Sequence, residues 1–221
     1  MIEIQNLCKS FDTASDTFHA LLDVNLKIKK GECIVIKGES GSGKSTLLSI
    51  IAAIMKPSSG KVLIDGENIV SFSDIHASEY RKTRVGFITQ SFHLFDSLSV
   101  EDNLLASLVI RDITQTQLKE NIDAALTQAH IEHKRFQKAD TLSGGEKQRC
   151  VIARAIVNNP DILICDEPTA NLDLQNSMLF IETIKALKER GKTIIISTHD
   201  QIFNELKFID KTYVMKDGTL G

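Results

Sequence analysis

The chain has 221 residues, of which 42% are apolar and 25% are charged, so it is long enough to bury a hydrophobic core. Its 26 Lys and Arg against 29 Asp and Glu give a net charge of −3, which excludes the basic excess of a nucleic-acid-binding protein. The four cysteines are scattered without a C-x-x-C pair. This pattern favours reduced thiols in the cytoplasm over a disulfide framework or a zinc site. The cysteines are Cys8, Cys33, Cys150 and Cys165.

Direct membrane insertion is not expected. The first residues, "MIEIQNLCKSF", lack the basic and then apolar pattern of a signal peptide. The most apolar helical stretch, Leu47 to Met55, is too short to span a bilayer. Any role at a membrane therefore has to come through a protein partner.

Strands and helices are expected to alternate along most of the chain. Residues 1–30 alternate polar and apolar side chains without a helix, which predicts a small antiparallel β flap. Further strands are predicted at residues 33–37, 61–66, 85–89, 161–167 and 192–197. Helices are predicted at residues 44–55, over most of 100–130 with a break around Asp112 and Thr114, and near 174–189. The order predicts an α/β fold with a mostly parallel sheet covered by helices, and a hairpin turning at Asp217-Gly218 ends the chain.

A phosphate-binding loop lies between the strand at 33–37 and the helix that follows it. Gly38, Gly43, Lys44 and Ser45 match the pattern G-x-x-x-x-G-K-[ST]. The glycines let the backbone wrap a phosphate chain, Lys44 supplies a cation to the β- and γ-phosphates, and the Ser45 hydroxyl can bind Mg²⁺. The loop as a whole comprises Gly38, Glu39, Ser40, Gly41, Ser42, Gly43, Lys44, Ser45 and Thr46.

Two acidic residues end the apolar strand "ILIC". Asp166 stands at the carboxyl end of a predicted parallel strand, where ligands of such sheets bind, and is the expected Mg²⁺ partner, through water. Glu167 follows it and is a candidate to orient and deprotonate an attacking water. An acidic pair that simply faces solvent is the alternative, which the neighbouring phosphate loop disfavours.

A second anion site is predicted about a hundred residues after the phosphate loop. Ser143, Gly144 and Gly145 stand where a helix is expected to begin, and a helix N-terminus without bulky side chains offers free N–H groups and a positive dipole end. These three residues are called the signature start below. A chain of this size has no evident need of two phosphate sites.

Four segments in this order resemble the ATP-binding subunits of ABC transporters: the phosphate loop, "LSGGEKQR", "ILICDEPTANLD" and "IISTHD". The similarity extends over essentially the whole chain. It implies a P-loop NTPase core with an N-terminal antiparallel β flap and an inserted helical subdomain. It further implies an ATPase that uses ATP and Mg²⁺. The nucleotide-binding core would comprise about residues 1–90 and 159–221, and the helical signature lobe about residues 91–158.

The resemblance also implies roles for single residues. Asp166 and Glu167 resemble the Walker B aspartate and the catalytic glutamate, and His199 resembles the switch histidine at the γ-phosphate. The expected catalytic residues are Glu167, His199 and Lys44. The expected metal-binding residues are Ser45, Gln90 and Asp166.

Gln90 looks like the Q-loop glutamine, which senses Mg²⁺ and water and contacts the permease. Asp173 belongs with Asn171 and Leu172 to a segment like the D-loop. Phe11 matches the aromatic residue that stacks on adenine, and a place in the core is its alternative.

In this family the second phosphate site serves a different chain. The resemblance implies a homodimer in the ATP-bound state, in which each ATP lies between the phosphate loop of one subunit and the signature start of the other. Closure would complete the cage around the γ-phosphate and exclude water. Hydrolysis would then reopen the dimer, and this cycle would drive integral membrane permease subunits from the cytoplasmic face of the inner membrane.

The segments "KPSSGKVLIDGENI" and "YRKTRVGFITQSFHLF" are most similar to the lipoprotein-releasing and macrolide-export branch of the family. A cell-division type that signals through a membrane partner, and small-solute or peptide-detoxification types, are the alternatives. Only about fifty residues separate Gln90 from the signature start, too few for the coiled coil of a chromosome-type relative. Apolar residues in this stretch are expected to form the helical lobe and, in part, a groove for a permease helix.

Overall fold

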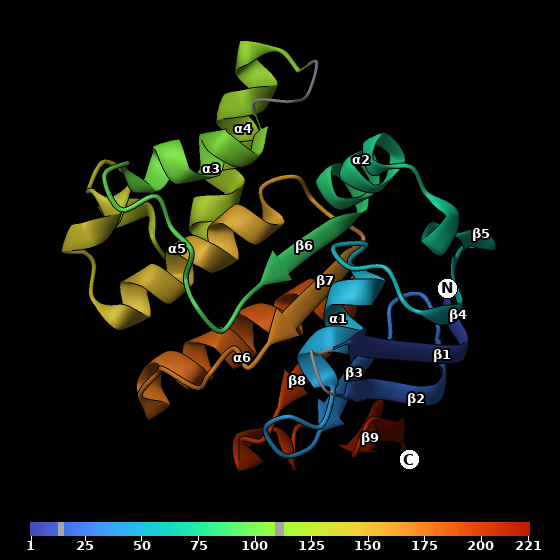
Figure 1. The fold of residues 1–221 in the computed structure, drawn as a ribbon. Helices are drawn as coiled ribbons and strands as arrows, with labels where there is room; N and C mark the ends of the chain where they lie inside the picture. Colours follow the sequence, from blue (N-terminus) through green and yellow to red (C-terminus); the bar gives the residue numbers. More distant parts are fainter. Residues whose placement is uncertain (13–15, 109–112) are drawn as a thin grey trace.

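The computed structural model describes residues 1–12, 16–108 and 113–221 (Figure 1). Its larger sheet has six strands in the order β10-β9-β3-β8-β7-β6. All neighbouring strands in it are parallel except the hairpin of β9 and β10. The strands are β3 (Cys33–Lys37), β6 (Val85–Ile88), β7 (Ile162–Asp166), β8 (Thr193–Thr198), β9 (Lys211–Lys216) and β10 (Thr219–Leu220). The predicted parallel sheet and terminal hairpin are confirmed.

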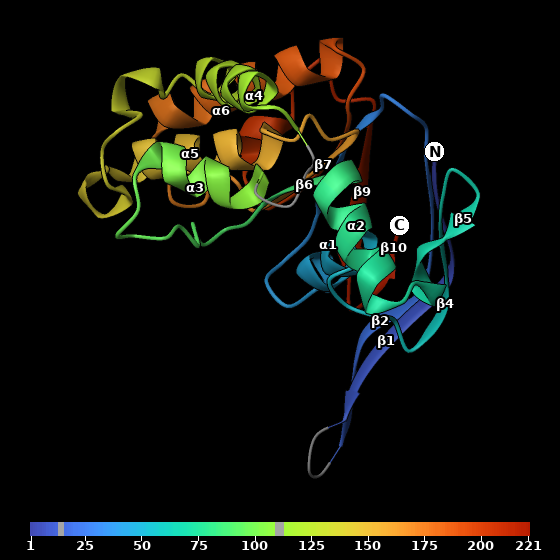
Figure 2. The same ribbon diagram turned by 90° about the horizontal axis from the view of Figure 1, so that it is seen from above.

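The smaller sheet is antiparallel and has the order β2-β1-β4-β5. Its strands are β1 (Ile2–Asp12), β2 (Thr17–Ile28), β4 (Ser59–Ile64) and β5 (Glu67–Asn68). The β1–β2 hairpin extends away from the rest of the molecule in Figure 2. This sheet is the predicted flap, to which β4 and β5 add residues that lie beyond the first thirty.

The helices fall into two groups in both views. Helices α3, α4, α5 and α6 lie together on one side of the six-stranded sheet, whereas α1 lies with the antiparallel sheet on the other (Figures 1 and 2). The α-helices are α1 (Lys44–Ile51), α2 (Asp74–Arg84), α3 (Val100–Leu108), α4 (Gln115–Gln128), α5 (Gly144–Ile156) and α6 (Leu174–Glu189). Short 3₁₀ helices occur at Ile69–Ser71, Glu132–Lys134, Ala139–Thr141 and Gln201–Phe203.

The central strands β3, β7 and β8 are mostly apolar, because both faces of the sheet are covered. Alternate residues of a strand point to opposite faces. Cys33 and Val35 of β3 accordingly pack into one hydrophobic core with the helices α3 to α6. Ile34 and Ile36 pack into a second core with α1 and the antiparallel sheet. The two cores hold the carboxyl ends of β3, β7 and β8 side by side.

Two expectations about the helices need correction. Helix α1 ends at Ile51 instead of residue 55, and α2 was not expected at all. The two differences are connected, because Tyr80 of α2 donates its hydroxyl hydrogen to the Ile51 carbonyl at 3.1 Å and Arg81 donates to the Ala53 carbonyl at 2.7 Å. Contacts from α2 thus satisfy carbonyls at the end of α1. The break expected around Asp112 lies outside the described residues, and Thr114 caps α4.

Gly86 sets the packing of β6 against α5. A Cβ atom there would lie 2.4 Å from the backbone oxygen of Ala155, closer than real contacts allow. We expect Gly86→Ala to lower the free energy of unfolding by about 1–3 kcal/mol, because strand and helix must move apart. Urea unfolding measures the loss, with Gly144→Ala as the control, since a Cβ at Gly144 lies 3.9 Å from the nearest atom. Equal stability of the two variants would contradict this packing.

All four cysteines are free thiols, and three of them, Cys33, Cys150 and Cys165, are buried. Burial raises the pKa of the Cys33 and Cys150 thiols to about 12. They therefore behave as small apolar core residues at neutral pH. Within the described parts of the chain, no helix has the length and apolar character required to cross a bilayer.

Candidate nucleotide site

The phosphate loop connects β3 to α1, as predicted. Gly43 caps the amino end of α1 with a φ of 106°, a backbone conformation that favours glycine. A Cβ at this position would lie 2.4 Å from the Ala20 carbonyl of β2. The loop is thus pressed against the antiparallel sheet, and its first helical turn points amide groups outward to receive an anion.

Lys44 is held in the loop by its own backbone. Its Nζ donates hydrogen bonds to the carbonyl oxygens of Gly38 at 2.7 Å and Glu39 at 2.9 Å. It also lies 3.5 Å from Oε1 of Glu167, and the side chains of Lys44 and Glu167 are only 6% and 11% exposed. A nearly buried cation therefore faces the place where phosphates would enter, with Glu167 as its present anionic partner.

Asp166 ends β7 beside the start of α1. Its Oδ1 accepts a hydrogen bond from the Ser45 hydroxyl at 3.0 Å and another from the Ser197 hydroxyl of β8 at 2.5 Å. A carboxylate and a hydroxyl oxygen next to a phosphate loop are ligands that Mg²⁺ accepts, the remaining positions being filled by water and phosphate. The residues present therefore fit this ion. Ser197 was not identified from the sequence.

Glu167 has an unusual backbone for a non-glycine residue, with a φ of 46°. Its N–H donates to the Ser197 carbonyl at 3.0 Å, which fixes the turn after β7. Its Oε2 lies 2.9 Å from Nδ1 of His199 and accepts a hydrogen bond from the His199 backbone N–H at 3.3 Å. One carboxylate oxygen thus faces the histidine and the other faces Lys44.

Lys44, Ser45, Glu167 and His199 line a cavity of about 270 Å³ at the carboxyl ends of the parallel strands. It is called the phosphate-loop cavity below. Gly38, Glu39 and Ser42 line a neighbouring cavity against β9 instead. The lining residues of the phosphate-loop cavity are Phe18, Ala20, Ser40, Gly41, Gly43, Lys44, Ser45, Thr46, Gln90, Glu167 and His199.

The aromatic residue in this lining is Phe18, which the sequence reasoning missed. Phe11 is its direct partner across the β1–β2 hairpin, so both rings stand on the same face of the hairpin. Phe11 is 37% exposed and Phe18 is 55% exposed, and the ring of Phe11 lies under the Lys9 ammonium at 4.9 Å. Stacking of Phe11 on a base stays a prediction, and Phe18 joins it as a candidate.

The signature start opens α5, as predicted. Ser143 is its N-cap and forms a reciprocal capping box with Glu146: the Ser143 hydroxyl accepts from the Glu146 N–H at 3.4 Å, and the Glu146 carboxylate accepts from the Ser143 N–H at 2.8 Å. Ser143 and Gly144 are exposed to solvent. The amides of the first helical turn lack partners within the helix, so this end can bind an anion supplied from outside.

The signature start lies beside the D-loop segment. Asp173 caps α6 by accepting from the Asn176 N–H at 2.8 Å, and Asn176 in turn accepts from Arg149 of α5 at 2.6 Å. Of the described residues, none of the signature start or Asp173 lines the phosphate-loop cavity. The sites predicted from the sequence therefore form two groups within one chain. Asn171 connects them by donating to the Gln90 carbonyl at 3.1 Å.

The capping box makes stability depend on pH. The Ser143 N–H, with help from Lys134, lowers the pKa of Glu146 to about 2 from 4.5. Because this pKa is lower in the folded state than in the unfolded state, the ionised Glu146 carboxylate adds to the free energy of unfolding. The full contribution is present above about pH 4.5 and is lost as the pH falls towards about 2. The wild type should therefore exceed Glu146→Gln in its urea midpoint at neutral pH. The difference should shrink by more than half by about pH 3. Glu120→Gln, at an exposed position on α4, is the control, and a difference independent of pH would contradict the assignment.

Comparison with known proteins agrees with this geometry. The family model described as "ABC transporter" matches residues 21–170. The macrolide export ATP-binding/permease protein MacB of Vibrio parahaemolyticus is 33% identical over 220 residues, which are 100% of this chain and 33% of MacB. The methionine import ATP-binding protein MetN 2 of Bacillus cereus is 36% identical over 226 residues, which are 100% of this chain and 66% of that protein.

Solved structures of MJ0796 from Methanocaldococcus jannaschii share the fold. One, described as a dimeric bacterial ABC transporter cassette, superposes with a TM-score of 0.92 at 35% identity and covers 100% of this chain and 96% of MJ0796. Another is a dimeric post-hydrolysis state bound to ADP and Pi, with a TM-score of 0.92 at 34% identity. The P-loop fold and the ATPase assignment made from the sequence are thereby confirmed. The chain belongs to the ABC transporter family, as a nucleotide-binding cassette that hydrolyses ATP.

Proposed function

We propose that two copies of this chain close head to tail around ATP and reopen after hydrolysis. The observation that carries this proposal is the separation of two phosphate-binding features in one chain. Lys44 and its neighbours line the phosphate-loop cavity, whereas the signature start lies on α5 with the other helices of that side (Figure 1). A second copy can present its exposed Ser143 to the open side of a bound nucleotide. The dimeric MJ0796 structures support this arrangement.

In the proposed site, ATP replaces Glu167 as the anionic partner of Lys44. The ammonium is already aimed by the carbonyls of Gly38 and Glu39, so little reorganisation is needed. Ser45 and Asp166 would hold Mg²⁺ with Gln90 nearby, and its charge would neutralise phosphate oxygens.

Glu167 is the proposed general base. Because Oε2 is engaged by His199, we assign proton acceptance from the attacking water to Oε1, the oxygen on the side of Lys44. The strained φ of Glu167 and its hydrogen bond to Ser197 hold the carboxylate in this direction. His199, which is mainly exposed, is placed to meet the γ-phosphate once the second subunit covers the site.

The helical side of the molecule is the proposed contact with a permease. Residues 91–158 would form a lobe separate from the nucleotide-binding core of residues 1–90 and 159–221. Phe95 and Leu98, shortly after Gln90, are 55% and 37% exposed although they are large and apolar. Large apolar residues that are exposed next to one another mark sites of protein–protein interaction. Through them the cassette would sit on the cytoplasmic face of the inner membrane.

The permease that fits best is of the lipoprotein-release or macrolide-export type. Similarity to MacB over the whole of this chain supports it. The similarity to a methionine import protein favours a small-solute importer as the second candidate. The two differ in the permease, since the first type has few transmembrane helices and a large extracytoplasmic domain.

Cross-linking in the native host distinguishes the candidates. The tagged cassette should capture an integral membrane protein with few transmembrane helices and a large extracytoplasmic domain. Phe95→Ser should lose this protein, whereas Ile75→Ser should retain it, because Ile75 is apolar and 81% exposed but lies on α2, outside the helical lobe. Capture of a permease without an extracytoplasmic domain would contradict the export assignment, and equal capture by both variants would contradict the contact.

A further inference from the structure

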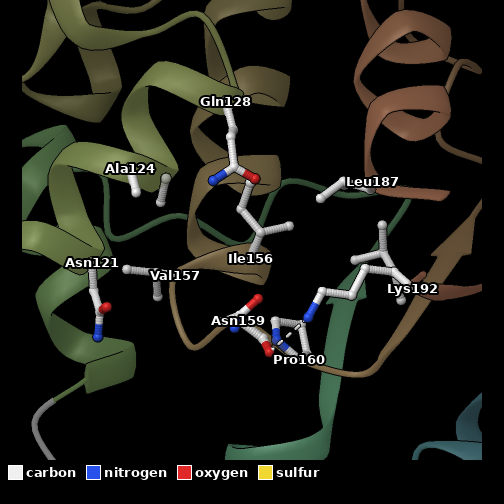
Figure 3. A pocket seen from close by; sticks show the side chains of 11 residues that line it. Asn121, Ala124, Gln128, Ile156, Val157, Asn159, Pro160, Leu187 and Lys192 are labelled. Atoms are coloured by element: carbon white, nitrogen blue, oxygen red, sulfur yellow. Dashed lines mark hydrogen bonds between the residues drawn. The ribbon is translucent and has the colours of Figure 1, made fainter. Parts of the chain in front are cut away.

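A separate cavity of about 290 Å³ lies at the amino ends of β7 and β8 (Figure 3). Pro160 and Lys192 line it, and they stand just before β7 and β8, whereas the phosphate loop follows the carboxyl end of β3. It is called the Lys192 cavity below. Its lining residues are Asn121, Ala124, Ala125, Gln128, Ile156, Val157, Asn159, Pro160, Leu163, Leu187 and Lys192.

Seven of the eleven residues that line this cavity are apolar, and the polar ones are Asn121, Gln128, Asn159 and Lys192. Helix α4 contributes Gln128, whose amide extends towards Ile156 in Figure 3, and Leu187 of α6 faces them from the other side. Lys192 crosses the cavity edge, where its ammonium donates to the Asn159 carbonyl at 3.1 Å. An apolar pocket with a few convergent polar groups is typical of small-molecule sites.

Lys192 is a cation among charged neighbours of both signs. Burial lowers the pKa of Lys192. Among its charged neighbours Asp161 has the largest effect and raises this pKa, whereas the cations Lys30 and Arg190 lower it. The Asp161 carboxylate is 2.9 Å from Nε of Arg84 and is already paired there. The Asn159 carbonyl is a neutral acceptor, so Lys192 has room for an anionic partner with which it would form a stronger hydrogen bond.

We propose that the Lys192 cavity binds a small carboxylate with an apolar tail, whose carboxylate pairs with Lys192 and whose tail packs between α4 and α6. The volume corresponds to about ten water molecules at roughly 30 Å³ each, and so to a ligand of about ten non-hydrogen atoms. A saturated carboxylate of about eight carbons has this size. The site is independent of the nucleotide site and lies beyond the proposed transport function.

Octanoate is the test ligand, titrated by calorimetry into the wild-type protein below its micelle concentration, with octanamide as the neutral match. Octanoate should bind saturably with one site per chain and should bind more tightly than octanamide. Lys192→Gln should weaken octanoate by about tenfold or more, because a charge-assisted hydrogen bond is lost, and should leave octanamide nearly unchanged. Lys185→Gln, at an exposed lysine of α6, is the matched control and should bind like the wild type.

A second variant tests the tail. Ala124 is exposed at the cavity rim, so Ala124→Phe can fill the cavity without disturbing the core and should abolish binding of both ligands. Saturable binding that survives Ala124→Phe, or that Lys192→Gln and Lys185→Gln weaken equally, would place the ligand elsewhere and overturn the proposal. So would failure of octanoate to bind the wild type.

Discussion

Replacement of Glu167 by glutamine should lower the rate of ATP hydrolysis by roughly a hundred- to ten-thousandfold, because the amide cannot accept the proton of the attacking water. ATP binding should persist and can become tighter, since the substitution removes the carboxylate that now lies 3.5 Å from Lys44. Steady-state phosphate release measures the first effect. Size-exclusion chromatography with light scattering should show a stable dimer in ATP.

The matched control for this variant is Glu182→Gln. Glu182 is exposed on α6, so this variant should hydrolyse ATP at the wild-type rate. Full turnover by Glu167→Gln would exclude the general-base role. A loss of turnover without a stable dimer would keep the base but contradict the closed, ATP-bound homodimer.

Replacement of Lys44 by alanine should weaken ATP binding by about ten- to a hundredfold or more, because charge-assisted hydrogen bonds to the phosphates are worth about 1.5–3 kcal/mol. The variant also leaves the carboxylate of Glu167, only 11% exposed, without its cation, so it should be less stable to urea when no nucleotide is present. Nucleotide titration followed by calorimetry measures the affinity.

Lys61→Ala is the control, because Lys61 is an exposed lysine of β4. Restoring neutrality with the double variant Lys44→Ala, Glu167→Gln should recover part of the lost stability and none of the affinity for phosphate. Unchanged nucleotide affinity in Lys44→Ala would contradict the assignment of the phosphate loop.

The parallel sheet and the nucleotide residues could be predicted because their sequence signals are local. Residues 162–165 of β7 are buried on both faces of the sheet and are all apolar. The phosphate loop requires glycine at positions such as Gly43, where the backbone is left-handed and the Ala20 carbonyl is close. In each case the residues that carry the signal are consecutive in the sequence.

Features that depend on contacts between distant segments could not be predicted. Helix α2 is mostly polar and buries little beyond Ala77 and Tyr80, so its sequence has no clear apolar period. The end of α1 depends on Tyr80 and Arg81 of that same helix. The pairing of Ser197 with Asp166 joins residues 31 positions apart through the register of β7 and β8. Phe18 enters the cavity lining only because the hairpin places it opposite Phe11.

The shared nucleotide site is tested most directly by the structure of Glu167→Gln crystallised with Mg²⁺ and ATP. We predict a head-to-tail dimer in which each γ-phosphate is contacted by Lys44 of one chain and by Ser143 of the other. A γ-phosphate contacted by Lys44 and Ser143 of the same chain would contradict it.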